Sequence, residues 1–159
     1  MDTAKKIEEL EPELIELRRD FHRHPELGLQ EVRTGGNVAE YLENLGMKVT
    51  RMNRTGVVGL LQGNGPGPTL MLRADMDALP IKEETGLDFQ SENEGVMHAC
   101  GHDAHTAMLM VAAKILSGMR DRISGNIKFV FQPNEENVGA LAMIEEGALE
   151  NPTVDACLG

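Results

Sequence analysis

The chain has 159 residues, of which 41% are hydrophobic and 26% are charged, and its formal net charge is -11 at pH 7. This length fits one domain with a single core, and the composition is that of a folded globular protein rather than a disordered or fibrous one. The strong negative charge argues against nucleic acid or an anionic membrane surface as a partner, because both would repel the chain.

Residues 1–10 mix charged and apolar side chains and lack the layout of a signal peptide, so a cytoplasmic location is expected. No apolar run is long enough to span a membrane. The chain has two cysteines, Cys100 and Cys157, in a composition unlike that of disulfide-rich secreted proteins. Both thiols are therefore predicted to be reduced, which leaves Cys100 available as a metal ligand.

The first half of the chain predicts two helices and then three strands. Apolar residues over 3–21 recur at three- and four-residue steps, which indicates an amphipathic helix that either starts near Glu11 or is kinked at Pro12. A second helix is expected over 34–45, with Gly46 as a left-handed cap. Short apolar runs separated by turn residues predict strands over 47–52, 57–62 and 69–74.

The second half predicts a loop followed by alternating helices and strands. The expected elements are a loop over 75–100, a largely buried helix over 104–119, a strand over 126–132, a short helix over 139–146 and a strand over 154–158. This order favours an α/β fold in which helices flank both faces of a mixed sheet. No internal linker is evident, so residues 1–159 are expected to belong to one domain.

Three polar clusters lie where a predicted strand ends or a predicted helix begins. They are residues 73–77 after the strand 69–74, residues 98–105 before the helix 104–119, and residues 132–136 after the strand 126–132. Open α/β sheets place their ligands at the carboxyl ends of strands. We therefore expect the three clusters to meet at one edge of the sheet.

The second cluster contains three His, one Cys and one Asp within eight residues. Neutral imidazole and thiolate are ligands that Zn²⁺, Mn²⁺ and Co²⁺ accept, and the Cys100-Gly-His102 spacing lets two ligands reach one ion from a tight turn. The alternative is that these histidines cap a helix or line a polar surface. The density of ligands favours a metal site.

The other two clusters supply carboxylates. Glu135 and Glu136 suggest that one carboxylate holds the metal while the other takes a proton from water, although paired glutamates are often solvated, as is expected for 83–84 and 145–146. Asp75 and Asp77 would point to the same side of a strand, and one of them is expected to receive the free ring N–H of a ligating His. Their alternative role is in a turn or helix cap. The His-rich segment 21–26 lies at a helix end, where basic side chains suit the dipole, and is interpreted as structural.

Four segments together resemble the M20 metallopeptidase family, in the amidohydrolase branch that contains hippurate hydrolases, N-acyl-amino-acid deacylases and auxin-conjugate hydrolases. The segments are DFHRHPELG (20–28), LRADMDALP (72–80), MHACGHDAH (97–105) and VFQPNEE (130–136). The resemblance implies a zinc-peptidase-like catalytic domain, of which residues 1–159 would be the incomplete amino-terminal part. The family's lid and dimerisation domain would be absent.

The resemblance also implies roles for individual residues. Cys100, His102 and Glu136 resemble metal ligands, Glu135 the general base, Asp77 the carboxylate that steers the metal site, and His105 and Asp75 residues that support the ligands. The complete family enzyme would hold two divalent ions (Zn, Mn or Co) and hydrolyse the amide bond of a small N-acyl amino acid or peptide, as an aminoacylase or carboxypeptidase does.

Two departures from the family pattern leave an alternative open. Asn134 stands where a small residue is usual and no Gly-rich run follows the glutamates, and further ligand histidines are expected beyond Gly159. The alternative is a noncatalytic metal-binding or interaction module, in which a partner chain completes the sheet at the edge formed by 154–158. An exposed apolar face would also favour a homo-oligomer.

Overall fold

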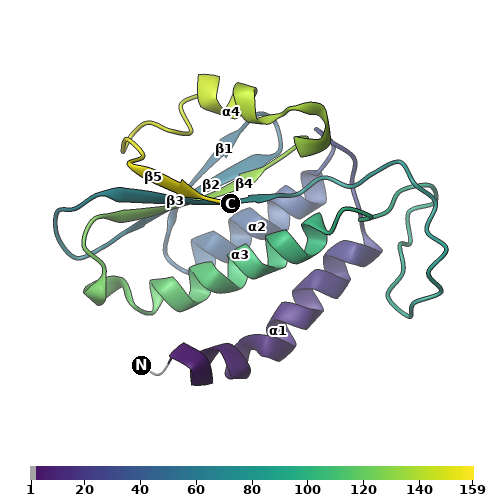
Figure 1. Ribbon diagram of the computed structural model, residues 1–159, viewed down its shortest axis with the longest axis horizontal. Coiled ribbons are helices and arrows are strands. Elements are labelled where there is room, and N and C mark those ends of the chain that lie inside the picture. Colours follow the sequence, from purple (N-terminus) through teal and green to yellow (C-terminus); the bar gives the residue numbers. More distant parts are fainter. Residues whose placement is uncertain (1–2) are drawn as a thin grey trace.

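A computed structural model describes residues 3–159 of the chain. Its middle layer is a five-stranded mixed sheet, with α2 and α3 over one face, α1 packed against α3 on that side, and α4 over the other face (Figure 1). This arrangement confirms the predicted fold class. The elements are α1 (Thr3–Arg23), α2 (Val32–Asn44), β1 (Lys48–Met52), β2 (Gly56–Gln62), β3 (Thr69–Asp75), α3 (His102–Ser117), η1 (Arg120–Arg122), β4 (Asn126–Gln132), η2 (Glu135–Asn137), α4 (Ala140–Glu145) and β5 (Ala156–Leu158).

The strand order β1-β2-β4-β3-β5 places β3 and β4 side by side near the centre of the sheet. These two strands are parallel, and Asp75 lies opposite Gln132 at their carboxyl ends. The hairpin of β1 and β2 pairs with β4 in antiparallel fashion, and β5 pairs with the outer edge of β3 in parallel. Because β3 and β4 are parallel, the segments that follow them leave the sheet at the same edge.

Strand β4 is buried on both faces. Ile127, Phe129 and Phe131 belong to the main core under the helices, whereas Val130 packs with Met143 of α4 on the opposite face. Full burial of a large apolar side chain contributes about 1.5–3 kcal/mol, and both phenylalanines are fully buried. The core therefore fixes the strand that leads directly into the two glutamates of the third cluster.

Lys128 points from β4 towards the α4 face and is buried. Its ammonium group donates hydrogen bonds to three backbone carbonyls, those of Ala148 (2.9 Å), Glu150 (2.8 Å) and Pro152 (3.0 Å). Burial holds the pKa of Lys128 below its ordinary value. The three bonds fasten the segment between α4 and β5 to the middle of the sheet.

The predicted helices and strands agree with the observed ones to within two residues at each end, and Gly46 has the expected left-handed conformation (φ 74°). The predicted helix over 3–21 is confirmed, and of the two alternatives at Pro12 the start near Glu11 is excluded, because α1 begins at Thr3 and continues through Pro12. One strand start needs correction. Strand β5 begins two residues later than predicted, at Ala156; just before it, Asp155 donates its backbone N–H to the carbonyl of Thr69 (2.9 Å), and its side chain accepts the N–H of Thr69 (2.7 Å). Among residues 3–159, no helix is long and apolar enough to cross a membrane.

Candidate functional site

The three polar clusters meet at the carboxyl ends of β3 and β4, as predicted. Asp75 is the last residue of β3, His102 is the first residue of α3, and Glu135 begins η2 directly after β4. The N–H of Met76 donates to the carbonyl of Gln132 (3.0 Å), which keeps the chain that follows β3 beside the end of β4. Parallel pairing thus brings three distant parts of the sequence to one place.

The imidazole of His102 lies at the centre of this site and is 2% exposed. Its Nδ1 lies 2.9 Å from the backbone carbonyl oxygen of Asp77 and 3.3 Å from Asp77 Oδ1, so we assign the ring N–H to Nδ1 and the lone pair to Nε2. Three carboxylate oxygens surround Nε2, at 3.7 Å (Asp75), 3.8 Å (Glu135) and 3.9 Å (Glu136). These separations are too long for hydrogen bonds and leave space for a cation.

Cys100, His102 and Glu136 each offer one ligand atom within 4.8 Å of the other two. Gly101 between them has a φ of 90°, a left-handed conformation that turns the chain so that both neighbours face the same point. Ligands bound at about 2.0–2.3 Å to a tetrahedral ion lie about 3.4 Å apart. Small rotations of the exposed Cys100 and partly exposed Glu136 side chains would close the set. Thiolate, imidazole and carboxylate together fit a borderline divalent ion.

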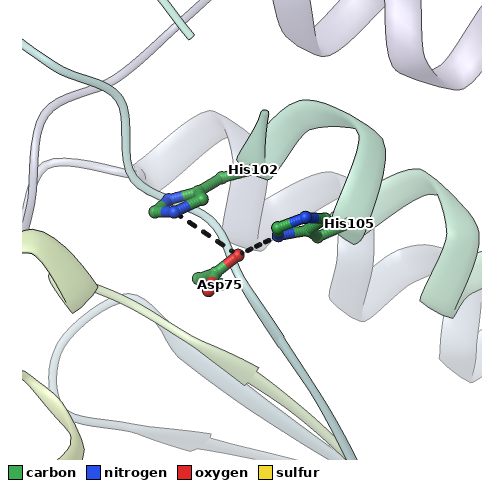
Figure 2. A group of neighbouring side chains, drawn as sticks. All are labelled: Asp75, His102 and His105. Atoms are coloured by element: carbon green, nitrogen blue, oxygen red, sulfur yellow. Dashed lines mark hydrogen bonds and ion pairs between the residues drawn. The ribbon is translucent and has the colours of Figure 1, made fainter. Parts of the chain in front are cut away.

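A second group of possible ligands, Asp75, His102 and His105, shares His102 with the first (Figure 2). Asp75 Oδ1 lies 2.7 Å from His105 Nδ1, and Asp75 Oδ2 accepts a hydrogen bond of 2.8 Å from Arg73. Both oxygens of Asp75 thus already have partners. His102 has one nitrogen with a free lone pair, so it can be a ligand in only one of the two groups at a time. The group with Cys100 is the better candidate, because both oxygens of Asp75 in the other group already have partners.

The electrostatics of the site favour protons on two of the candidate ligands. The hydrogen bond with Glu136, together with burial and the neighbouring carboxylates, raises the pKa of the Cys100 thiol. Burial opposes a charge on His102, but the hydrogen bond with Asp77 and the negative charges of Asp75 and Asp77 outweigh it and raise the pKa of His102. Burial also opposes ionisation of Asp77, yet its hydrogen bonds from His102 and from backbone N–H groups hold its pKa below the ordinary value.

Residues 133–139, which we call the glutamate loop, carry Glu135 and Glu136 in an irregular conformation. Asn134 and Val138 have left-handed backbones, with φ of 55° and 63°. The carbonyl of Asn134 accepts the N–H of Gly139 (2.8 Å). A Cβ atom at Gly28 would lie 2.1 Å from Asn134 Oδ1, so the glycine provides the space for this unusual asparagine.

A buried polar network lies behind the site. His22 Nδ1 lies 2.7 Å from Asp103 Oδ2, and His22 Nε2 lies 3.1 Å from Glu83 Oε1. The structural interpretation of His22 agrees with this arrangement, although its partners are carboxylates of α3 and of the loop before it. The prediction that Glu83 belongs to a solvated pair is wrong, because its side chain is 3% exposed. Glu145 and Glu146 are exposed, as predicted.

Glu31 was not among the predicted site residues. Its side chain is buried (0% exposed), and it lies just before α2. Its Oε1 accepts the backbone N–H of Asn134 (2.9 Å), and its Oε2 accepts the hydroxyl of Thr55 (2.6 Å). In the sequence, a glutamate near a predicted helix start is expected to be solvent-exposed. No pattern in the neighbouring residues indicates that Glu31 is buried.

Comparison with known proteins decides the family. Residues 71–159 match the model of peptidase family M20/M25/M40. The chain belongs to this family. The resemblance inferred from the sequence motifs is thereby confirmed.

M20 relatives of high similarity are hydrolases by name. An N-acyl-L-amino acid amidohydrolase of Geobacillus stearothermophilus is 46% identical over 156 residues, which cover 96% of this chain and 42% of the relative. Thermostable carboxypeptidase 1 of Saccharolobus solfataricus is 47% identical over 158 residues, covering 94% of this chain and 40% of the relative.

A solved M20 structure shares the fold. The crystal structure of a Bacillus subtilis dinuclear metal-binding peptidase of this family superposes with a TM-score of 0.87 and 40% identity, over 99% of this chain and 43% of that one. The predicted similarity to the catalytic domain of these peptidases is thus confirmed. The chain spans about two fifths of the length of these relatives.

Proposed function

We propose that this chain takes part in metal-dependent hydrolysis of the amide bond of N-acyl amino acids or peptides, as an aminoacylase or carboxypeptidase does. The observation that carries the proposal is that Glu135, whose side chain is 39% exposed, lies beside the ligand set of Cys100, His102 and Glu136. Relatives named amidohydrolase and carboxypeptidase support it, because both names describe cleavage of an amide bond.

Cys100, His102 and Glu136 are the proposed ligands of a Zn, Mn or Co ion. A divalent ion bound there supplies a Lewis acid that polarises the amide carbonyl and lowers the pKa of water. The related dinuclear peptidase supports a second ion in the complete site.

Glu135 is the proposed general base. Its Oε2 lies 3.8 Å from His102 Nε2, yet it lies outside the three-ligand set and remains accessible to water and substrate. A carboxylate in this position accepts a proton from the attacking water and then donates it to the amine nitrogen as the C–N bond breaks. The hydroxyl group thus ends on the carboxylic acid product and the proton on the amine.

Asp77, Asp75 and His105 are proposed to orient the ligands. Asp77 accepts the ring N–H of His102 at its backbone carbonyl (2.9 Å) and the backbone N–H of Glu136 at Oδ2 (3.1 Å), so it contacts two proposed ligands at once. Asp75 bridges His105 and Arg73 next to His102. Such hydrogen-bonding partners fix the orientation of metal ligands and raise metal affinity.

Removal of metal tests the proposed activity. We expect a chelator to abolish release of the free amine from N-acetyl and N-benzoyl amino acids by the full-length protein, and Mn²⁺, Zn²⁺ or Co²⁺ to restore it. Elemental analysis before and after chelation establishes that the metal has left and returned. Hydrolysis that continues at the full rate in the metal-free protein would contradict the proposal.

Metal affinity should rise with pH. The pKa of His102 lies above its ordinary 6.5 and that of Cys100 above its ordinary 9.0, so at pH 7 protons compete with the ion for both ligands. Binding at neutral pH should therefore release about one proton per ion from Cys100 and a further fraction of a proton from His102. Calorimetry in buffers of different ionisation enthalpy measures this number, and Cys100→Ser should release about one proton fewer. An affinity that does not change between pH 6.5 and 9 would contradict the assigned ligands.

The exposed edge of the sheet favours the second candidate function, a noncatalytic metal-binding or interaction module. All three residues of β5 are exposed, and an edge strand presents N–H and C=O groups to which another strand can pair. A groove of about 450 Å³ beside Asp75 and His105 reaches Leu158 of this strand. Metal binding without hydrolysis, combined with a stable complex or homodimer in size-exclusion chromatography, would favour this function over the first.

A further inference from the structure

Two buried carboxylates hold the glutamate loop, one on each side of Glu135. Glu31 accepts the backbone N–H of Asn134 (2.9 Å), and Asp77 accepts the backbone N–H of Glu136 (3.1 Å). Hydrogen bonds to an ionised carboxylate are roughly twice as strong as neutral ones. The backbone on either side of Glu135 is therefore fixed from inside the domain.

The glutamate loop needs such support because its conformation is costly. Asn134 and Val138 both have positive φ, a conformation that is strained for residues other than glycine and most strained for a β-branched residue such as Val138. A loop of this kind persists only where its surroundings over-determine it. Val138 is 80% exposed, so its side chain contributes little packing energy. The buried contact with Glu31 is at the other end of the loop, at the Asn134 amide.

Glu31 is itself held rigidly. It is 0% exposed at the start of α2, and its second oxygen accepts the hydroxyl of Thr55 (2.6 Å) in the turn between β1 and β2. Hydrogen bonds to both oxygens offset the cost of burying a carboxylate. Glu31 thus joins α2, the β1–β2 turn and the glutamate loop at one point.

We propose that Glu31 is a positioning residue, which sets the place of Glu136 in the ligand set and of Glu135 beside it by holding the Asn134 amide. This inference rests on the proposed metal site. Glu31 is not one of the proposed ligands and bonds to the loop through the Asn134 amide, so its effect on the site passes through the backbone of the loop.

The test compares three substitutions in the full-length protein by Co²⁺ titration. Glu31→Leu removes the acceptor of the Asn134 amide and should weaken Co²⁺ binding about tenfold, the lower end of the range for residues that support metal ligands. Glu31→Gln should bind like the wild type, because its carbonyl can accept the Asn134 amide while its NH₂ group donates to Thr55. Thr55→Val removes the other bond of Glu31 and should lower the melting temperature, but it should weaken Co²⁺ binding less than Glu31→Leu does, because the Asn134 amide keeps its acceptor.

Two further measurements separate positioning from general destabilisation. The Co²⁺ absorption spectrum, which reports the geometry of the ligands, should change in Glu31→Leu and not in Thr55→Val. Hydrogen exchange at the Asn134 amide should accelerate in Glu31→Leu alone. If that variant does not fold, Glu31→Asp replaces it with the same expectation, because the shorter side chain withdraws its carboxylate from the amide.

The outcomes are distinguishable. Wild-type Co²⁺ affinity in a folded Glu31→Leu protein, or binding by Glu31→Gln as weak as that of Glu31→Leu, would overturn the role of Glu31. A wild-type protein that binds no Co²⁺ would overturn the proposed metal site instead. Faster exchange at the Asn134 amide in Glu31→Leu would then still show that Glu31 holds the loop.

Discussion

Replacing Cys100 by serine should weaken the binding of Zn²⁺ or Co²⁺ by at least about 100-fold, because a thiolate is replaced by a hydroxyl that stays protonated and is a poor ligand for these ions. Cys100 is exposed beside His102 and Glu136, so its loss removes one of the three proposed ligands without changing the core. Titration with Co²⁺ measures the effect directly. The absorption band that arises from thiolate-to-cobalt charge transfer should disappear in the variant.

The second cysteine provides a matched control. Cys157 is also a free, exposed thiol, but it lies in β5 at the sheet edge. Cys157→Ser should therefore keep both the wild-type affinity and the charge-transfer band. If Cys157→Ser lost the band while Cys100→Ser kept it, the ligand set proposed at the start of α3 would be wrong.

Replacing Glu135 by glutamine should lower kcat for hydrolysis of N-acyl amino acids by about 10²–10⁴-fold in the full-length protein, the contribution that general bases typically make. Metal content should stay the same, because Glu135 lies outside the set formed by Cys100, His102 and Glu136. Glutamine has nearly the same size as glutamate but cannot accept the proton. Steady-state kinetics with the released amine as the readout, beside elemental analysis, separates lost proton transfer from lost metal.

Glu145→Gln is the control for this substitution. It makes the same chemical change at an exposed residue of α4 and should leave kcat, KM and metal content unchanged. The complementary variant Glu136→Gln should lose metal and turnover together. Turnover by Glu135→Gln within a few-fold of the wild type would show that another group acts as the base.

Patterns that depend on neighbouring residues were predictable from the sequence. Strand β4 was placed correctly at both ends, because its apolar residues alternate and Pro133 stops the run. The clusters around Asp75, His102 and Glu135 were recognisable because each is dense in chemically active side chains and adjoins a strand or helix end. Their meeting at the carboxyl ends of neighbouring strands was expected from the predicted α/β fold.

Features that depend on distant partners were not predictable. Glu31 and Asn134 are 103 positions apart, and Glu83 meets His22 across 61 positions. A glutamate has the same sequence signature whether it is solvated or receives a buried N–H. Pro12 shows the same limit for backbone structure, since its preference for the first turn of a helix could not decide between a start near Glu11 and a longer helix, and α1 in fact begins at Thr3.

The hydrogen bonds from Lys128 to three backbone carbonyls fix the segment that leads into β5, the strand to which a partner strand could pair. The ammonium group of Lys128 is buried in β4, the strand that leads towards Glu135. Displacing residues 148–152 would remove its three hydrogen-bond acceptors and leave a buried charge unpaired, which is costly. Movement of residues 148–152 is therefore opposed by their hydrogen bonds to β4. A partner strand bound at β5 would therefore lie beside a segment that is fastened to β4, the strand that leads into the loop with the proposed base.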